Sequence, residues 1–114
     1  MNIEDFYNYC LSFKDSKEEM PFDNETLVFK IKGKIFTLTN INTFEFINLK
    51  CNPTQALELR EKYHSVKPGY HMNKKHWNSI YVNGNDIDDY LIKIWISNSY
   101  NLVLKKTSTN KYEF

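Results

Sequence analysis

Apolar residues recur with a helical period in three stretches of the chain. In the first, Asn2 can cap a helix, and the apolar positions follow at i, i+3, i+4, i+7 and i+8. They are Ile3, Phe6, Tyr7, Cys10 and Leu11. This spacing predicts a helix over residues 3–13 with one apolar face.

The second and third helices are marked by their start signals. Asn52 followed by Pro53 is a typical helix start, and it predicts a helix over residues 52–63. A last helix is expected to begin at Asn85 or Asp86, with acids in its first turn. Its apolar side is formed by Ile87, Leu91, Ile94, Trp95 and Leu102.

Between these helices the pattern changes to that of strands. Residues 27–32 and 35–39 are rich in β-forming residues around a tight turn at Gly33-Lys34, which predicts a hairpin. Residues 45–50 and 77–82 predict further strands, and the alternation at Tyr70 and Met72 is typical of a half-buried one. The polar side chains expected on one face of the sheet or at its edge are Lys30, Lys32, Thr37, Thr39, Asn48 and Lys50. Residues 14–26 are polar, contain Pro21 and predict a loop.

The predicted order is therefore α-β-β-β-α-β-β-α. It indicates an α+β protein in which helices pack on one face of an antiparallel sheet. The 114 residues fit a single domain, 1–114, with a core over 3–106 and a frayed tail at 107–114.

Composition adds few constraints on function. Cys10 and Cys51 are far apart and favour two small buried thiols in a reducing compartment. The acidic N-terminus has no signal core and no apolar run is long enough to span a membrane, so we expect a cytoplasmic protein. No phosphate-binding glycine motif is present, and the spacing of the histidines is not typical of zinc ligands. We expect no cofactor, no metal and no enzymatic activity.

The net charge of +1 conceals an uneven distribution along the chain. Residues 1–26 carry seven acids and two bases, a balance of −5, whereas residues 27–84 carry nine bases and three acids, a balance of +6. A basic middle favours an anionic partner. Because the chain is rich in lysine throughout, the position of the lysines is more informative than their number.

The most informative segment is residues 66–80, VKPGYHMNKKHWNSI, which contains lysines, histidines and aromatic residues and no acid. Lysines attract phosphates, and aromatic rings among them can stack on bases. Asn73 and Asn78 can hydrogen-bond phosphates or base edges. Trp77 begins an apolar strand, which favours a core position. With the hairpin lysines, the candidate nucleic-acid contacts are Lys32, Lys34, Lys67, Tyr70, His71, Asn73, Lys74, Lys75, His76 and Trp77.

Several stretches resemble the MmcQ/YjbR family of small bacterial domains. PGYHMNKKHWNSI at 68–80 is similar to its diagnostic motif, and LVFKIKGKIFTL at 27–38 to its first hairpin. The Lys-Cys-x-Pro junction at 50–53 and the Ser-Tyr-x-Leu-Val element at 99–103 also match, although residues 12–20 lack the usual Pro-Gly loop. The resemblance implies the same element order and a double-wing architecture with a predicted role in DNA binding.

Three functions are compatible with these observations. In the first, the hairpin turn at 33–34 and the loop at 73–76 act as two wings on DNA. In the second, the protein is an interaction module, in which the acidic stretch 14–26 meets the basic segment of a second copy or of another protein. In the third, Tyr70, His71 and His76 form a small-ligand site.

Overall fold

The computed structural model describes the backbone of residues 1–111 and the side chains of residues 1–106. Three helices, α1 (Ile3–Leu11), α2 (Pro53–Lys62) and α3 (Asp89–Lys111), accompany one sheet. The strands are β1 (Lys17–Glu19), β2 (Thr26–Ile31), β3 (Lys34–Asn40), β4 (Phe46–Lys50), β5 (Val66–Pro68) and β6 (Trp77–Tyr81). They pair in the order β1-β2-β3-β4-β6-β5, and every neighbouring pair is antiparallel.

The predicted fold class is confirmed, and the structure adds one strand to it. Residues 17–19 were expected in a loop but pair with β2 as an edge strand. Only three residues long and fully exposed, β1 has no buried face and hence no alternating pattern that could have predicted it. The tail predicted at 107–114 continues α3 to Lys111, and its remainder, 112–114, lies outside the described residues.

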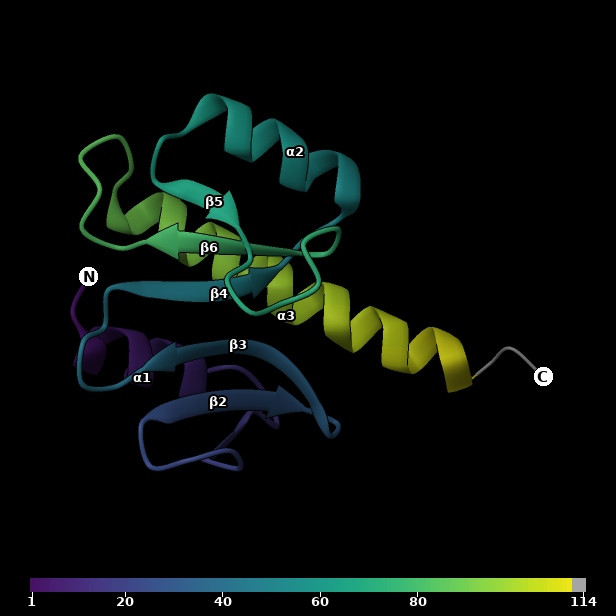
Figure 1. Ribbon diagram of the computed structural model, residues 1–114. Helices are drawn as coiled ribbons and strands as arrows, with labels where there is room; N and C mark the ends of the chain where they lie inside the picture. Colours follow the sequence, from purple (N-terminus) through teal and green to yellow (C-terminus); the bar gives the residue numbers. More distant parts are fainter. Residues whose placement is uncertain (112–114) are drawn as a thin grey trace.

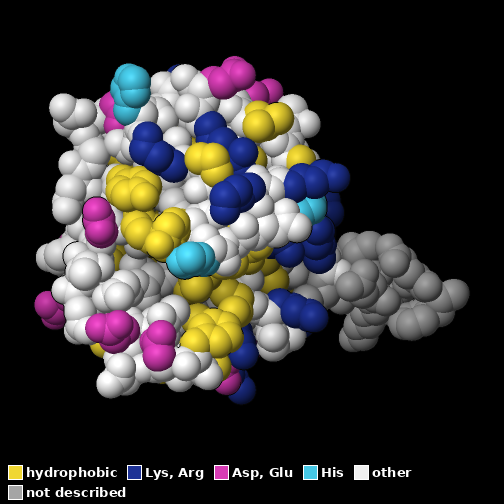
Figure 2. All heavy atoms as spheres, in the orientation of Figure 1, with side chains coloured by type: hydrophobic (Ala, Val, Ile, Leu, Met, Phe, Trp, Pro, Cys, Tyr) yellow, Lys and Arg dark blue, Asp and Glu magenta, His cyan; other side chains and the backbone are white. Residues whose placement is uncertain are grey.

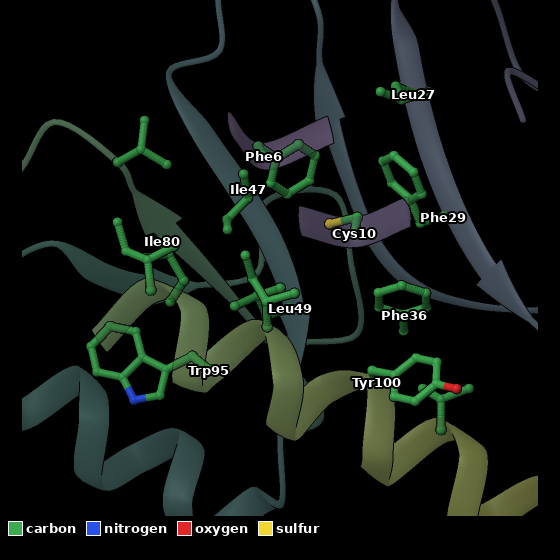
Figure 3. Close-up of a cluster of buried hydrophobic side chains, with 14 of the residues drawn as sticks. Phe6, Cys10, Leu27, Phe29, Phe36, Ile47, Leu49, Ile80, Trp95 and Tyr100 are labelled. Atoms are coloured by element: carbon green, nitrogen blue, oxygen red, sulfur yellow. The ribbon is translucent and has the colours of Figure 1, made fainter. Parts of the chain in front are cut away.

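The helices cover one face of the sheet and leave the other open. In Figure 1, α1 and α3 lie behind the strands, and α2 lies beside β5 and β6. Figure 3 shows the core on this covered face, where Phe6 and Cys10 of α1 meet Phe29 of β2 and Tyr100 of α3. The rings of Phe6 and Phe29 meet edge to face, with centroids 5.8 Å apart. We call the opposite, helix-free side the open face.

Local sequence signals explain most of the helix starts. Asn2 accepts a hydrogen bond from the backbone of Asp5 (2.8 Å), and Asn52 accepts one from Thr54 (3.0 Å), so both predicted caps are confirmed. The prediction for α3 is wrong by two or three residues, because Asp88 provides the cap in place of Asn85 or Asp86, accepting from the backbone of Leu91 at 2.9 Å. Asp86 instead accepts hydrogen bonds from Ser65, which holds its pKa below the usual value.

The hairpin turn also lies one residue earlier than predicted. Ile31 pairs with Lys34, so Lys32 and Gly33 are the two central residues. Both have positive φ, 51° and 78°, as a type I′ turn requires. Lys34 therefore belongs to β3 and extends from the end of the sheet.

A β-bulge separates this turn from the rest of the hairpin. Phe29 pairs with Thr37, but the next residue, Lys30, pairs with Ile35, so Phe36 has no partner across the sheet. Phe36 and Thr37 are both fully buried. An extra residue of this kind shifts the alternation of side chains along the strand.

This shift overturns the expectation that Thr37 and Thr39 face solvent. Both pair with core residues of β4 and are buried under the helices. Each hydroxyl donates to a backbone carbonyl, Thr37 to Asn48 (2.9 Å) and Thr39 to Phe46 (2.7 Å), which removes the cost of burying it. The open face is formed instead by the alternate residues of β4, Phe46, Asn48 and Lys50.

Candidate nucleic-acid interface

The segment 66–80 consists of a short strand, a closed loop and a second strand. The loop at 69–76 is held to itself, because Gly69 donates to the carbonyl of Trp77 (2.9 Å) and Met72 donates to that of Gly69 (3.2 Å). A side chain at position 69 would place its Cβ 2.8 Å from the Cβ of Trp77. The glycine of the Pro-Gly pair is thus required for the loop to lie against β6.

A buried polar network fixes this loop to the open face. The backbone of Tyr70 donates to the hydroxyl of Ser79 (2.9 Å), and its carbonyl accepts from the side-chain amide of Asn48 (3.3 Å). The hydroxyl of Ser79 donates in turn to Asn48. Because these partners project from neighbouring strands, the loop is positioned by the middle of the sheet.

A second anchor comes from α2. The Arg60 guanidinium donates to the side chain of Asn78 (2.7 Å), to the carbonyl of Trp77 (3.2 Å) and to that of Lys74. Asn78 also donates to the carbonyl of Ala56 (3.2 Å) and is 1% exposed. The suggestion that Asn78 reads phosphate or base edges is therefore wrong, since its side chain is used within the protein.

Three of the candidate contact residues, Trp77, Lys74 and Asn73, also make interactions within the protein. Trp77 is buried, at 9% exposure, so its ring offers little surface for stacking. Lys74 directs its Nζ to the carbonyl of Gly69 (3.0 Å), and the side-chain oxygen of Asn73 accepts from the backbone of Lys75 (2.9 Å). These bonds show that Lys74 and Asn73 help to close the loop, although both side chains remain exposed.

Five cationic or titratable side chains gather where β3 begins, β4 ends and the loop meets α3. We call this cluster the basic end: Lys34, Lys50, Lys75, His76 and Lys106. Figure 2 shows lysine and arginine side chains collected on this side of the open face, next to a histidine. Within the described part of the chain, none of the five forms an ion pair.

Two groups of the basic end, Lys50 and His76, have lowered pKa values. Partial burial, followed by the charges of Lys106 and Lys34, lowers the pKa of Lys50. Desolvation, then Lys106, Lys50 and Lys75, lowers the pKa of His76. In both groups desolvation and neighbouring positive charge disfavour the charged form, and a nearby anion would favour it.

Lys34, Lys75 and His76 of this cluster were predicted from sequence, whereas Lys50 and Lys106 were not. These two join the cluster only because β4 lies beside β6 and α3 crosses the end of the sheet. No local pattern signals such a contact between distant segments. The other predicted lysines lie apart: Lys32 borders a hollow with Asp15 and Glu19, and Lys67 lies on the open face opposite Ser79.

The open face also has a groove of about 470 Å³. Its lining includes Phe22, Leu38, Phe46, Asn48, Tyr70 and His71. Phe22 is 66% exposed and Tyr70 55%, so both rings present most of their surface to solvent. Figure 2 shows the corresponding band of hydrophobic side chains across the open face.

Of the three residues of the predicted small-ligand site, Tyr70 and His71 both border the groove, whereas His76 is not among its lining residues. His76 lies instead among the lysines of the basic end. No cluster of three metal-ligating side chains occurs within the described residues. A hollow of about 80 Å³ between α2, α3 and β4, bordered by Cys51 and Trp95, is below the usual size of a ligand pocket.

The acidic stretch 14–26 uses several of its carboxylates internally. Glu18 accepts from the Tyr7 hydroxyl, Glu19 pairs with Lys30 (2.6 Å), and Asp23 accepts from the backbone of its own loop. These groups are less available to meet the basic segment of a second copy. This arrangement weakens the charge argument for the interaction-module alternative.

The fold and the site together define a small α+β domain with an anchored Pro-Gly loop on an open sheet face. The YjbR family model matches residues 11–102, and the chain belongs to this family. It is 49% identical over 85 residues to YbdF of Escherichia coli O157:H7, covering 74% of this chain and 69% of YbdF. It is 25% identical over 107 residues to YjbR of Escherichia coli K12, covering 90% and 91%. Both relatives are described as uncharacterized proteins.

Two solved structures share the fold. The crystal structure of a Deinococcus radiodurans protein superposes with a TM-score of 0.87 at 37% identity, covering 93% of this chain and 80% of its own. A crystal structure of a Pseudomonas syringae protein gives 0.77 at 28% identity, covering 90% and 99%. Within the described residues, no helix has the length and apolar character needed to cross a membrane.

Proposed function

We propose that the protein binds nucleic acid without catalysing a reaction, and that the basic end holds the phosphates. The observation that supports this proposal is the convergence of Lys34, Lys50, Lys75, His76 and Lys106 from four separate segments. When cations that form no ion pair within the protein bind the phosphates of a nucleic acid, counterions are released, and this release favours binding.

The geometry supports a surface contact. Lys34 begins β3 directly after the hairpin turn, and Lys75 lies in the anchored loop, so each belongs to one of the two wings expected from sequence. Lys50 ends β4, which lies between β3 and β6, and it pairs with Trp77 directly after the loop that carries Lys75. A phosphate backbone following this end of the sheet would meet one cation after another.

A salt titration of binding tests the proposal. Four phosphate contacts on duplex DNA predict a slope of log affinity against log salt of about −3 to −4. The double substitution Lys75→Glu/Lys106→Glu removes two contacts and is expected to reduce this slope by about 2. Fluorescence anisotropy with a labelled duplex measures both quantities.

A matched control keeps the net charge of that variant. Lys62→Glu/Lys93→Glu makes the same charge change, and Lys93 lies 13 residues from Lys106 on α3, or roughly 20 Å along the helix. It is expected to keep most of the salt slope. Equal losses in the two variants, or absence of binding at low salt, would contradict the proposal.

Binding is also expected to strengthen as the pH falls. Desolvation and the charges of Lys106, Lys50 and Lys75 lower the pKa of free His76, and a phosphate at the basic end would raise it, so binding takes up a proton. Affinity should therefore rise between about pH 8 and about pH 5.5, and His76→Gln should flatten the dependence. In the free protein the same lowered pKa has the opposite effect on stability, which decreases as the pH falls below about 6.5. If the affinity of His76→Gln depends on pH as strongly as that of the native protein, His76 is not the group that takes up the proton on binding.

A further inference from the structure

The groove on the open face has two aromatic edges, and each is held in place. On one side, the backbone of Tyr70 is bonded to Ser79 and Asn48, as described above. His71 adopts a left-handed backbone conformation with φ of 57°, which is unusual for a residue other than glycine. Its ring lies 4.0 Å from that of Tyr70, between centroids.

The other edge carries Phe22. The next residue, Asp23, accepts hydrogen bonds from the backbone of Glu25 (2.9 Å) and Thr26 (2.7 Å), and these bonds lower the pKa of its carboxyl group. This turn fixes the loop that presents Phe22 to solvent. Two exposed rings on opposite sides of a groove are thus both pre-positioned, although neither is needed to fill the core.

The chemistry of the groove favours a flat, uncharged ligand with polar edges. Phe46 underlies it, meeting Tyr70 edge to face with centroids 5.8 Å apart. Asn40 presents its side-chain NH2, since its oxygen accepts from the backbone of Asn42 and Thr43, and the lining includes threonines but neither lysine nor carboxylate. Its volume of about 470 Å³ lies within the range of ordinary ligand sites.

The groove and Lys50 of the basic end lie on the same face of β4. Alternate residues of one strand share a face, so Phe46, Asn48 and Lys50 of β4 lead from the groove to the cations. Four residues of strand span roughly 13 Å. Lys67 stands on the same face, opposite Ser79, beside the Tyr70 edge.

We propose that the groove binds an unpaired base of a single-stranded nucleic acid whose phosphates lie on the basic end. This rests on the proposed function and specifies the form of nucleic acid. The base stacks on Tyr70 or Phe22, and the side-chain NH2 of Asn40 donates to its polar edge. Asp23 and Glu25 repel phosphates from the Phe22 edge, so the strand leaves the groove toward Lys67 and Lys50.

The test compares single-stranded and duplex probes at fixed salt. Tyr70→Ala and Phe22→Ala are each expected to weaken binding of a labelled oligothymidylate on the order of tenfold, with duplex binding changed by less than about twofold. Tyr90→Ala is the matched control, because Tyr90 is 72% exposed and lies on α3 away from the groove. A single strand with abasic positions keeps its phosphates and should lose the same increment as Tyr70→Ala.

Photo-crosslinking gives a readout that does not depend on the stability of any variant. An oligothymidylate containing iodouracil should crosslink the native protein at Tyr70, His71 or Phe22, located by mass spectrometry. Crosslinks confined to the basic end, or equal affinities of Tyr70→Ala and Tyr90→Ala, would overturn the base site while leaving phosphate binding intact.

The remaining outcomes separate this proposal from the proposed function. If Lys75→Glu/Lys106→Glu reduces binding of both probes and the groove variants reduce neither, phosphate binding stands and the base site is wrong. If neither probe binds at low salt, both proposals fail. If Tyr70→Ala instead abolishes self-association of the native protein, detected by light scattering, the groove is occupied by a second copy and the base site is wrong.

Discussion

Replacing Ser99 with alanine is expected to lower the free energy of unfolding by about 2–4 kcal/mol, because two buried backbone groups lose their partner together. Ser99 is fully buried on α3. Its hydroxyl donates to the carbonyl of Phe36 (2.6 Å) and accepts from the backbone N–H of Lys50 (2.9 Å). Phe36 is the unpaired residue of the bulge, and Lys50 pairs with Trp77 of β6 but has no partner on β3, so β3 and β4 offer these two groups no ladder bond in place of the hydroxyl.

Urea unfolding followed by circular dichroism measures this change. Ser97→Ala is the control, since Ser97 is on the same helix and accepts only a long bond from Asn101 (3.5 Å). Both variants gain the helix propensity of alanine, a few tenths of a kcal/mol, so the difference between them isolates the buried bonds. Equal stabilities would show that water or a shifted backbone satisfies Phe36 and Lys50 when the hydroxyl is removed.

The role of Ser99 explains part of the family resemblance in physical terms. In the Ser-Tyr-x-Leu-Val element, the serine hydroxyl donates to the carbonyl of Phe36 in the bulge. The next residue, Tyr100, packs against the Phe36 ring with centroids 5.3 Å apart. Likewise the Pro-Gly pair permits the close approach of the loop to Trp77. Many residues of the motifs that identify the family therefore stabilise the fold, and they give no direct information about the ligand.

The elements that sequence predicted well are those with a local cause. Apolar periodicity and caps at Asn2 and Asn52 located two helix starts, and the β-rich run around Gly33 located the hairpin. The start of α3 was misplaced because Asp86 and Asp88 are equally good caps in sequence. In the folded protein Asp86 accepts from Ser65, which is 21 positions away, and this contact cannot be recognised from the local sequence.

The candidate site was predicted less completely, because its parts are assembled by tertiary contacts. The basic composition of residues 66–80 located the loop, yet Lys74 and Asn73 form hydrogen bonds that close it. Lys50 and Lys106 come from a strand end and a helix far from the loop. Charge along the sequence therefore identified the right region of the protein, and the sheet order determined which cations meet.

Replacing Arg60 with methionine is expected to lower the free energy of unfolding by about 3 kcal/mol and to weaken nucleic-acid binding. Hydrogen bonds from a charged donor contribute about 1.5–3 kcal/mol, and Arg60 makes bonds to Asn78, Trp77 and Lys74. Methionine keeps much of the aliphatic bulk and leaves the Asn78 oxygen buried without this donor. Thermal unfolding should shift by roughly 4 °C for each kcal/mol lost.

The effect on binding follows from the position of the loop rather than from the lost charge. Lys62→Met removes the same charge two residues away on α2, where the ammonium lies 5.4 Å from the centroid of the Tyr63 ring. We expect Lys62→Met to retain stability and most of the affinity. Arg60→Lys keeps the charge, but its single nitrogen cannot reach three acceptors on two elements, so it should resemble Arg60→Met. If Arg60→Lys instead restored both properties, charge alone would explain the role of Arg60, and the loop carrying Lys75 and His76 would be positioned by the sheet without help from α2.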